Sequence, residues 1–143
     1  MEADRKLFPE SELTEKVIGV FYSVYNELGP GFLESIYENA MAIALQEVGL
    51  ATSQQVPLAV WFRNRAVGEF RMDLLVENKL ALELKAVSQL MPIHAFQLVN
   101  YLKATRLEVG LLLNFGPKPQ LKRCVYGHGP LYPHSFAPIC VQK

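Results

Sequence analysis

The sequence of 143 residues contains only two cysteines and no excess of charge of either sign. The two cysteines, Cys124 and Cys140, are too few for a disulfide scaffold, and no CxxC pair occurs. Lysine and arginine together number 14, as do aspartate and glutamate. This balance argues against a protein that coats nucleic acid regardless of sequence, but it leaves room for an enzyme that contacts nucleic acid over one local patch.

Long apolar runs and nucleotide-binding loops are also missing. The densest apolar stretch, residues 109–115, is interrupted by Gly110 and Asn114, and it is far shorter than the roughly 20 residues of a membrane helix. Residues 1–10 lack the apolar region of a signal peptide. We therefore expect no membrane association and a reducing, cytoplasmic setting. The absence of a glycine-rich phosphate loop and of G-x-S-x-G argues against a P-loop enzyme and a serine hydrolase.

Half of the residues are hydrophobic and a fifth are charged, which is typical of one folded domain. Capping residues and helical apolar spacing predict helices from Ser11 or Thr14 to residue 28 and over residues 32–48. Pro92 fits the first turn of a third helix, over residues 92–104. Alternating or continuous apolar residues predict strands over residues 56–62, 67–76, 80–87, 108–115 and 121–126.

These elements follow the order ααβββαββ, which predicts an α/β domain of layered α+β type over residues 1–126. The first three strands are expected to form an antiparallel meander. Residues 127–143 are rich in proline and glycine and are interpreted as a tail. His128, His134 and Cys140 in that segment lack the spacing of metal ligands, so we interpret them as incidental.

The turn at residues 77–79 fixes the pairing of the strands around it. A three-residue loop places Leu74 opposite Leu82 and Asp73 opposite Glu83, with the leucines on one face and the carboxylates on the other. Like charges directly opposite each other repel. A bound Mg²⁺ or Mn²⁺ would stabilise both carboxylates, because hard cations prefer oxygen ligands.

Lys85 lies two residues beyond Glu83 and therefore on the same face of the strand. Its ammonium group is suited to holding a water molecule beside a metal or to neutralising charge that develops on a phosphate. Asp73, Glu83 and Lys85 thus form a set for metal-assisted hydrolysis. The alternative is a solvated face carrying a weak surface ion pair.

The segment from Gly31 to Tyr37, GFLESIY, matches the G-x-x-E-x-x-Y signature, and further matches occur at residues 55–58, 71–76, 82–87 and 94–102. The sequence in this way resembles the GxxExxY proteins, which are similar to a branch of the PD-(D/E)XK nuclease superfamily. The resemblance extends over about residues 13–126. It implies a restriction-endonuclease-like core with one helix, three antiparallel strands, a crossover helix and a further strand.

The resemblance also implies roles for four residues. Asp73 and Glu83 would bind the metal, and Lys85 would act on the attacking water. Glu34 would be an additional acidic ligand or would hold a water molecule. A purely structural role for Glu34 is the alternative, because a carboxylate in the first turn of a helix interacts favourably with the helix dipole.

Four further residues are candidates for substrate or supporting contacts. Gln97 and Tyr101 match the Gln-x-x-x-Tyr pattern of related nucleases and share one helix face with His94. His94 is either a general base or a hydrogen-bonding residue near the start of its helix. Tyr37 is either a contact of the site or an aromatic residue of the core.

The sequence thus predicts a magnesium- or manganese-dependent nuclease acting on DNA or RNA. One alternative is a non-catalytic module of the same fold that binds nucleic acid or protein. Another is a hydrolase of small phosphoesters, because a domain of this size has little room for a long groove. A homodimer is a further candidate state, because small nucleases that cut both strands are often symmetric dimers.

Overall fold

The computed structural model describes residues 9–127 and 139–142. Over this part of the chain, no helix is long and apolar enough to cross a membrane. The elements in chain order are α2 (Ser11–Leu28), α3 (Glu34–Glu47), β1 (Thr52–Phe62), β2 (Arg65–Val76), β3 (Leu80–Lys85), α4 (Pro92–Ala104), β4 (Val109–Phe115), β5 (Pro119–Val125) and β6 (Ile139–Gln142).

The strands form a mixed sheet in the order β1-β2-β3-β4-β5-β6. The pairing of β3 with β4 is parallel and the other pairings are antiparallel. A parallel neighbour requires a crossover, and α4 provides it. The layered α+β fold, the meander of the first three strands and the crossover helix are confirmed.

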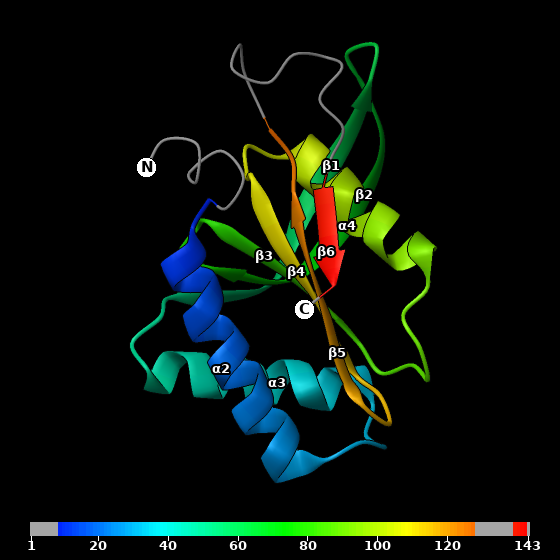
Figure 1. Ribbon diagram of the computed structural model, residues 1–143. Coiled ribbons are helices and arrows are strands. Elements are labelled where there is room, and N and C mark those ends of the chain that lie inside the picture. The colour runs from blue at the N-terminus through cyan, green and yellow to red at the C-terminus, as the bar shows by residue number, and fades with distance from the viewer. Residues whose placement is uncertain (1–8, 128–138, 143) are drawn as a thin grey trace.

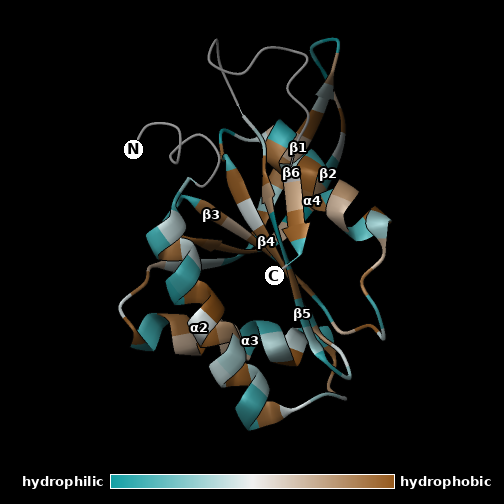
Figure 2. Ribbon diagram, viewed as in Figure 1, coloured by the Kyte–Doolittle hydropathy of each residue, from teal (hydrophilic) through white to brown (hydrophobic). Residues whose placement is uncertain are grey.

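Two apolar cores lie on opposite faces of the sheet, one beneath α2 and α3 and the other beneath α4. Figure 1 shows these three layers. In Figure 2 the central strands β3 and β4 are largely brown, whereas α2 and α3 carry teal residues on their outer sides. The predicted alternation around the turn at residues 77–79 is confirmed, because Leu74 and Leu82 lie in the core beneath α2 and α3 while Ala81 lies in the core beneath α4.

Phe115, at the end of β4, anchors both N-terminal helices to the sheet. The ring of Tyr37 from α3 stacks on it with 4.2 Å between centroids, and Phe21 from α2 meets it edge-on at 4.9 Å. The hydroxyl of Tyr25 donates a hydrogen bond of 2.6 Å to the Gly116 carbonyl. Aromatic contacts of this kind add to the free energy of burial, so they fix the position of both helices relative to the end of β4.

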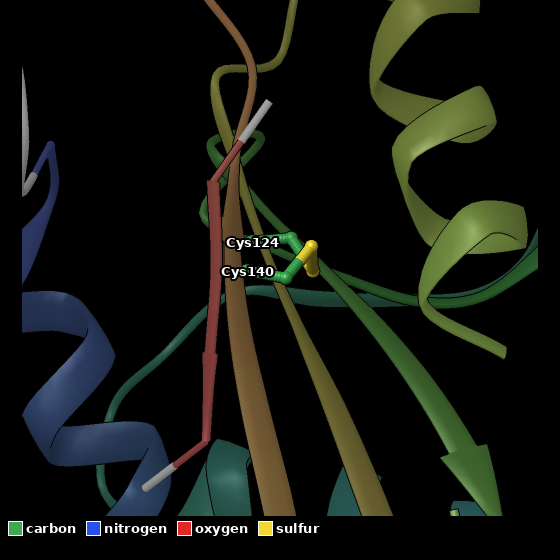
Figure 3. Close-up of a disulfide and its surroundings, with 2 residues drawn as sticks. All are labelled: Cys124 and Cys140. Atoms are coloured by element: carbon green, nitrogen blue, oxygen red, sulfur yellow. A yellow bond between two sulfur atoms is a disulfide. The ribbon is translucent and has the colours of Figure 1, made fainter. Parts of the chain in front are cut away.

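The C-terminal segment differs from the prediction. Residues 139–142 form β6, which pairs with β5 and places Cys140 opposite Cys124. A disulfide joins the two cysteines on the face of the sheet that α4 covers (Figure 3). The interpretation of residues 139–142 as a tail, and of Cys140 as incidental, was therefore wrong. Most of the remaining segment, including His128 and His134, lies outside the described residues.

Asn114 holds the connection that leads from β3 toward α4. Its side chain is fully buried, and its Oδ1 accepts a hydrogen bond of 3.0 Å from the Val87 N–H. Its Nδ2 donates to the Val87 carbonyl at 2.9 Å and to Gln120 Oε1 at 3.0 Å. Gln120 Oε1 also accepts a bond of 3.3 Å from the Leu90 N–H. These bonds satisfy the polar groups of a buried side chain and fix the backbone two residues beyond Lys85.

A substitution at Gly116 would test whether these hydrogen bonds of Asn114 and Gln120 fix the backbone at Val87. A Cβ at residue 116 would overlap the Val87 carbonyl oxygen and approach Asn114 Nδ2 to 2.9 Å. We expect Gly116→Ala to lower the free energy of unfolding by about 1–3 kcal/mol, because backbone atoms cannot rotate away from the added methyl. Urea unfolding would measure the change. Gly68→Ala is the control, because no atom lies within 4 Å of its added Cβ, and its effect should stay within about 0.5 kcal/mol. Equal stability of the two variants would contradict the close packing of Gly116 against Val87 and Asn114.

Candidate functional site

The candidate site lies where β2 and β3 separate. Their antiparallel register runs from Val76–Leu80 to Leu74–Leu82. Beyond this point β2 continues alongside β1, while β3 continues alongside β4. Asp73 and Glu83 are the first residues past the last registered pair, so their side chains come from two strands that diverge.

Both carboxylates are held by backbone groups of the opposite strand. Asp73 Oδ2 accepts a hydrogen bond of 2.8 Å from the Leu84 N–H, and Glu83 Oε1 accepts one of 3.3 Å from the Asp73 N–H. Asp73 thus supplies an acceptor for the Leu84 N–H, and Glu83 supplies one for the Asp73 N–H. The sequence placed Asp73 and Glu83 together, but it did not predict that the register would end before them.

The environment of this pair disfavours negative charge. Glu83 is only 5% exposed, and burial together with the charge of Asp73 raises the pKa of Glu83 to about 8. Burial also raises the pKa of Asp73, and the charge of nearby Glu38 raises it further. The raised pKa values mean that the ionised form of each acid is unfavourable in the absence of a positive charge. A bound cation would stabilise the ionised form of both, so the pair is suited to binding one.

Lys85 supplies a positive charge on the same side of the sheet. Alternation along β3 places Lys85, Glu83 and Ala81 on one face, and Ala81 belongs to the core beneath α4. The positive charge of Lys85 opposes the increase in the pKa of Glu83. The Glu-x-Lys spacing therefore brings an acid and an ammonium group to the same site, as the sequence predicted.

Glu34 lies at the border of the site. It is the first residue of α3, is solvent-exposed, and its Oε1 accepts a hydrogen bond of 3.4 Å from the Ala86 N–H just after β3. Its charge is a minor cause of the raised pKa values of Asp73 and Glu83. Over residues 9–127 and 139–142, no group of three acidic, histidine or cysteine side chains is positioned to hold a metal. The structure thus brings together the pair, but it does not assemble the three-carboxylate ligand set that includes Glu34.

Asp73 and Glu83 nevertheless fit a hard divalent cation by the chemistry of their atoms. Both are carboxylates, and burial raises the pKa of each. Magnesium is commonly bound through one or two carboxylates and retains several water molecules. A pair of protein ligands is therefore sufficient for this ion, and a complete cage of side chains is not required.

Glu38 and Gln55 support Asp73, although neither was predicted from the sequence to be a site residue. Gln55 Nε2 donates hydrogen bonds to Glu38 Oε1 at 2.5 Å and to Asp73 Oδ1 at 3.4 Å. The other oxygen of Glu38 accepts a bond of 2.9 Å from Gln54 Nε2. The signal available in the sequence was the spacing of four residues between Glu34 and Glu38, which places both on one face of α3.

Tyr101 of α4 is partly buried, whereas Gln97 is exposed one turn earlier in the helix. Burial and the charges of Glu83 and Asp73 raise the pKa of Tyr101 to about 12. The hydroxyl is protonated at neutral pH, as it is in an ordinary tyrosine, and the shift extends this to more alkaline pH. Gln97 and Tyr101 both line a hollow beside α4.

His94 and Tyr37 have structural roles in the described residues. His94 Nδ1 accepts a hydrogen bond of 2.9 Å from the Met91 N–H and so caps the start of α4. Burial, followed by the charge of Lys85, lowers the pKa of His94. Tyr37 is fully buried, and its hydroxyl donates to the Gly29 carbonyl at 2.6 Å and accepts from the Phe32 N–H at 3.1 Å. The geometry of Tyr37 is that of a core aromatic residue.

The raised pKa of Glu83 predicts a pH-dependent stability when no divalent cation is bound. Between its ordinary value of 4.5 and its folded value of about 8, Glu83 binds a proton more tightly in the folded state than in the unfolded state. Stability should therefore fall as the pH rises through this window. We expect Glu83→Gln to reduce that slope and to raise the Tm at pH 8 by about 4 °C, which corresponds to ~1 kcal/mol.

Thermal unfolding in EDTA from pH 5 to pH 8.5 would measure this effect. Glu69→Gln is the matched control, because the Glu69 side chain lies on the same strand as Asp73 and is 58% exposed. Parallel pH profiles for the native chain and the Glu83→Gln variant would contradict the prediction.

Comparisons with known proteins agree with this geometry. No curated protein matches the sequence. A solved structure titled "Crystal structure of SSO0001" shares the fold, with a TM-score of 0.52, 20% sequence identity and 87% of this chain covered. The alignment spans 63% of that protein's length. The family model of the PD-(D/E)XK nuclease superfamily matches residues 11–124, which is well over half of the chain. By this match, the chain belongs to the PD-(D/E)XK nuclease superfamily.

Proposed function

We propose that this chain is a metal-dependent nuclease that hydrolyses phosphodiester bonds of DNA or RNA. The observation that carries the proposal is the pair of Asp73, which is partly buried, and Glu83, which is buried, with raised pKa values and with Lys85 on the same face of β3 as Glu83. Acids with strongly shifted pKa values often mark functional sites. A surface ion pair, which was the alternative interpretation, does not account for a carboxylate that is only 5% exposed.

Asp73 and Glu83 would hold Mg²⁺ or Mn²⁺. When bound, the ion supplies a Lewis acid that activates water and stabilises negative charge on a phosphate. The backbone bonds from Leu84 and Asp73 keep the two carboxylates in place, so little reorganisation is needed for binding. Glu34 is proposed to contact water at the border of the site, because its carboxylate lies beside Ala86 at the end of β3.

Lys85 is the proposed catalytic cation. Its ammonium group would orient the attacking water and stabilise the negative charge that grows on the phosphate oxygens in the transition state. Tyr101 would add a neutral hydroxyl donor. The connection that follows Lys85 is fixed by Asn114, which limits the movement of the end of β3.

The first test concerns the metal. Mg²⁺ or Mn²⁺ should raise the Tm of the native chain, because a ligand that binds only the folded state stabilises it by about 2.7 kcal/mol at 100 times its Kd. Asp73→Asn should lose most of this response and should be more stable than the native chain in EDTA above about pH 8, where Glu83 is ionised and one of two repelling carboxylates is removed. Thermal unfolding with and without metal would measure both effects. The exposed Glu69→Gln control should respond as the native chain does, and an equal response of Asp73→Asn would refute the site.

The second test separates catalysis from binding. Lys85→Ala should reduce hydrolysis by about 10²–10³, which is typical for the loss of one group that stabilises transition-state charge. The metal-induced increase in Tm should remain, because both carboxylates are retained. Lys85→Arg should restore little activity, since a planar guanidinium does not replace a compact ammonium group.

A cleavage screen of single- and double-stranded DNA and RNA with Mg²⁺ or Mn²⁺ would measure this loss. Lys79→Ala is the matched control, because Lys79 is an exposed lysine in the turn at the other end of β3. A native chain that binds metal but cleaves none of these substrates would instead favour a non-catalytic binding module or a hydrolase of small phosphoesters.

A further inference from the structure

A hollow of about 660 Å³ lies between the β1–β2 hairpin and α4. Figure 1 shows the hairpin extending beside α4, away from α2 and α3. The volume is within the range of small-ligand sites. The residues that line it include Trp61, Phe70, Gln97, Asn100, Tyr101 and Lys103.

Aromatic rings form two sides of this hollow. Phe70 stacks on Tyr101 with 4.2 Å between ring centroids and 15° between the planes. Trp61, on β1, is 66% exposed although it is the largest apolar side chain in the sequence. A large aromatic side chain left in solvent at the mouth of a hollow is typical of a binding surface, because its burial by a ligand is favourable.

Polar groups accompany these rings. Gln97 and Asn100 of α4 line the same hollow, and each amide offers both hydrogen-bond donors and an acceptor. Lys103, one turn beyond Asn100, contributes a positive charge. Flat apolar faces, amides and a cation together match a nucleotide, which has a flat base with donors and acceptors on its edge and a negative phosphate.

Tyr101 connects the hollow with the acidic pair. One face of its ring stacks on Phe70, while the charges of Glu83 and Asp73 act on its hydroxyl. Tyr101 therefore belongs both to the hollow and to the surroundings of the acidic pair. A strand with one nucleotide in the hollow would extend from Tyr101 toward the metal pair proposed above.

We infer that the hollow binds a single unpaired nucleobase of the substrate, stacked against Trp61 beside the phosphodiester to be cleaved. This inference rests on the nuclease function proposed above and names its substrate class, which is single-stranded or locally unpaired nucleic acid. Bases inside a duplex have both faces stacked and cannot enter such a site unless they leave the helix. An apolar peptide segment is the rival occupant, but it would use neither the cation nor the closeness to the carboxylates.

Trp61 provides a direct readout, because it is the one tryptophan of the sequence. Short single-stranded oligonucleotides, of DNA and of RNA, would be titrated into the native chain in EDTA, where metal-dependent cleavage does not occur. We expect both the affinity and the quenching of tryptophan fluorescence to be much greater for base-containing strands than for abasic strands of equal length and charge. A blunt, fully paired duplex should quench little. The DNA and RNA arms would show which nucleic acid binds more tightly.

Variants test the contact itself. Trp61→Ala should weaken the binding of a labelled single strand by about tenfold or more, the usual loss when an aromatic platform for a base is removed. Trp61→Phe should restore most of the affinity, because it keeps an aromatic face. Phe62→Ala is the matched control, since Phe62 is the next aromatic residue on β1, is 58% exposed and does not line the hollow. Its affinity should stay within about twofold of the native value. Circular dichroism would verify folding.

Equal quenching by abasic and base-containing strands, or no binding of single strands, would overturn the inference. So would equal affinities of Trp61→Ala and Phe62→Ala. The outcome is separable from that of the nuclease proposal, because Lys85→Ala should lose cleavage and still show base-dependent quenching. A chain that binds unpaired bases but never cleaves would retain the nucleobase site and lose only the catalytic assignment.

Discussion

The end of the β2–β3 register at Leu74 and Leu82 is the constraint on which the rest of the site depends. A backbone N–H without an acceptor is costly inside a protein, and the N–H groups of Leu84 and Asp73 both lie at this point of the sheet. Asp73 and Glu83 provide the missing acceptors, so the gap in the ladder holds two carboxylates close together. Glu83 is buried at this gap and Asp73 is partly buried, and burial raises the pKa of each. A structural requirement and a chemical one are thus met by the same pair of side chains.

The surrounding elements keep this gap in place. On the α3 side, Glu38 holds Gln55, which in turn donates to Asp73. On the β4 side, Asn114 fixes the backbone at Val87, just beyond Lys85. Stacking of Phe115 with residues of α2 and α3 connects the end of β4 to those helices. Because the repelling acids lower stability when no cation is bound, the neighbouring packing and hydrogen bonds must offset that cost.

The sequence predicted the features that depend on local periodicity. Alternating apolar residues and the length of the turn at residues 77–79 were sufficient for the meander and for the pairing of Leu74 with Leu82. The missed features depend on contacts between distant segments. Strand β6 has only four residues, and its partner β5 ends at Val125, so the two strands are separated in the sequence by the proline- and glycine-rich segment. Asn114 was visible as an interruption of an apolar run, but its partners at Val87 and Gln120 are set by the tertiary fold.

The balance of charges limits how such a protein can hold nucleic acid. With equal numbers of basic and acidic residues, neutralisation of many phosphates is not available as the main source of affinity. The acidic pair makes this limit stricter, because its own charge repels the phosphate that has to approach it. A bound divalent cation removes part of that repulsion, and stacking on exposed aromatic residues adds free energy that does not depend on net charge. The proposed metal site and the proposed base-binding hollow are therefore complementary. The cation reduces the repulsion of the phosphate, and the hollow adds affinity that needs no excess of positive charge.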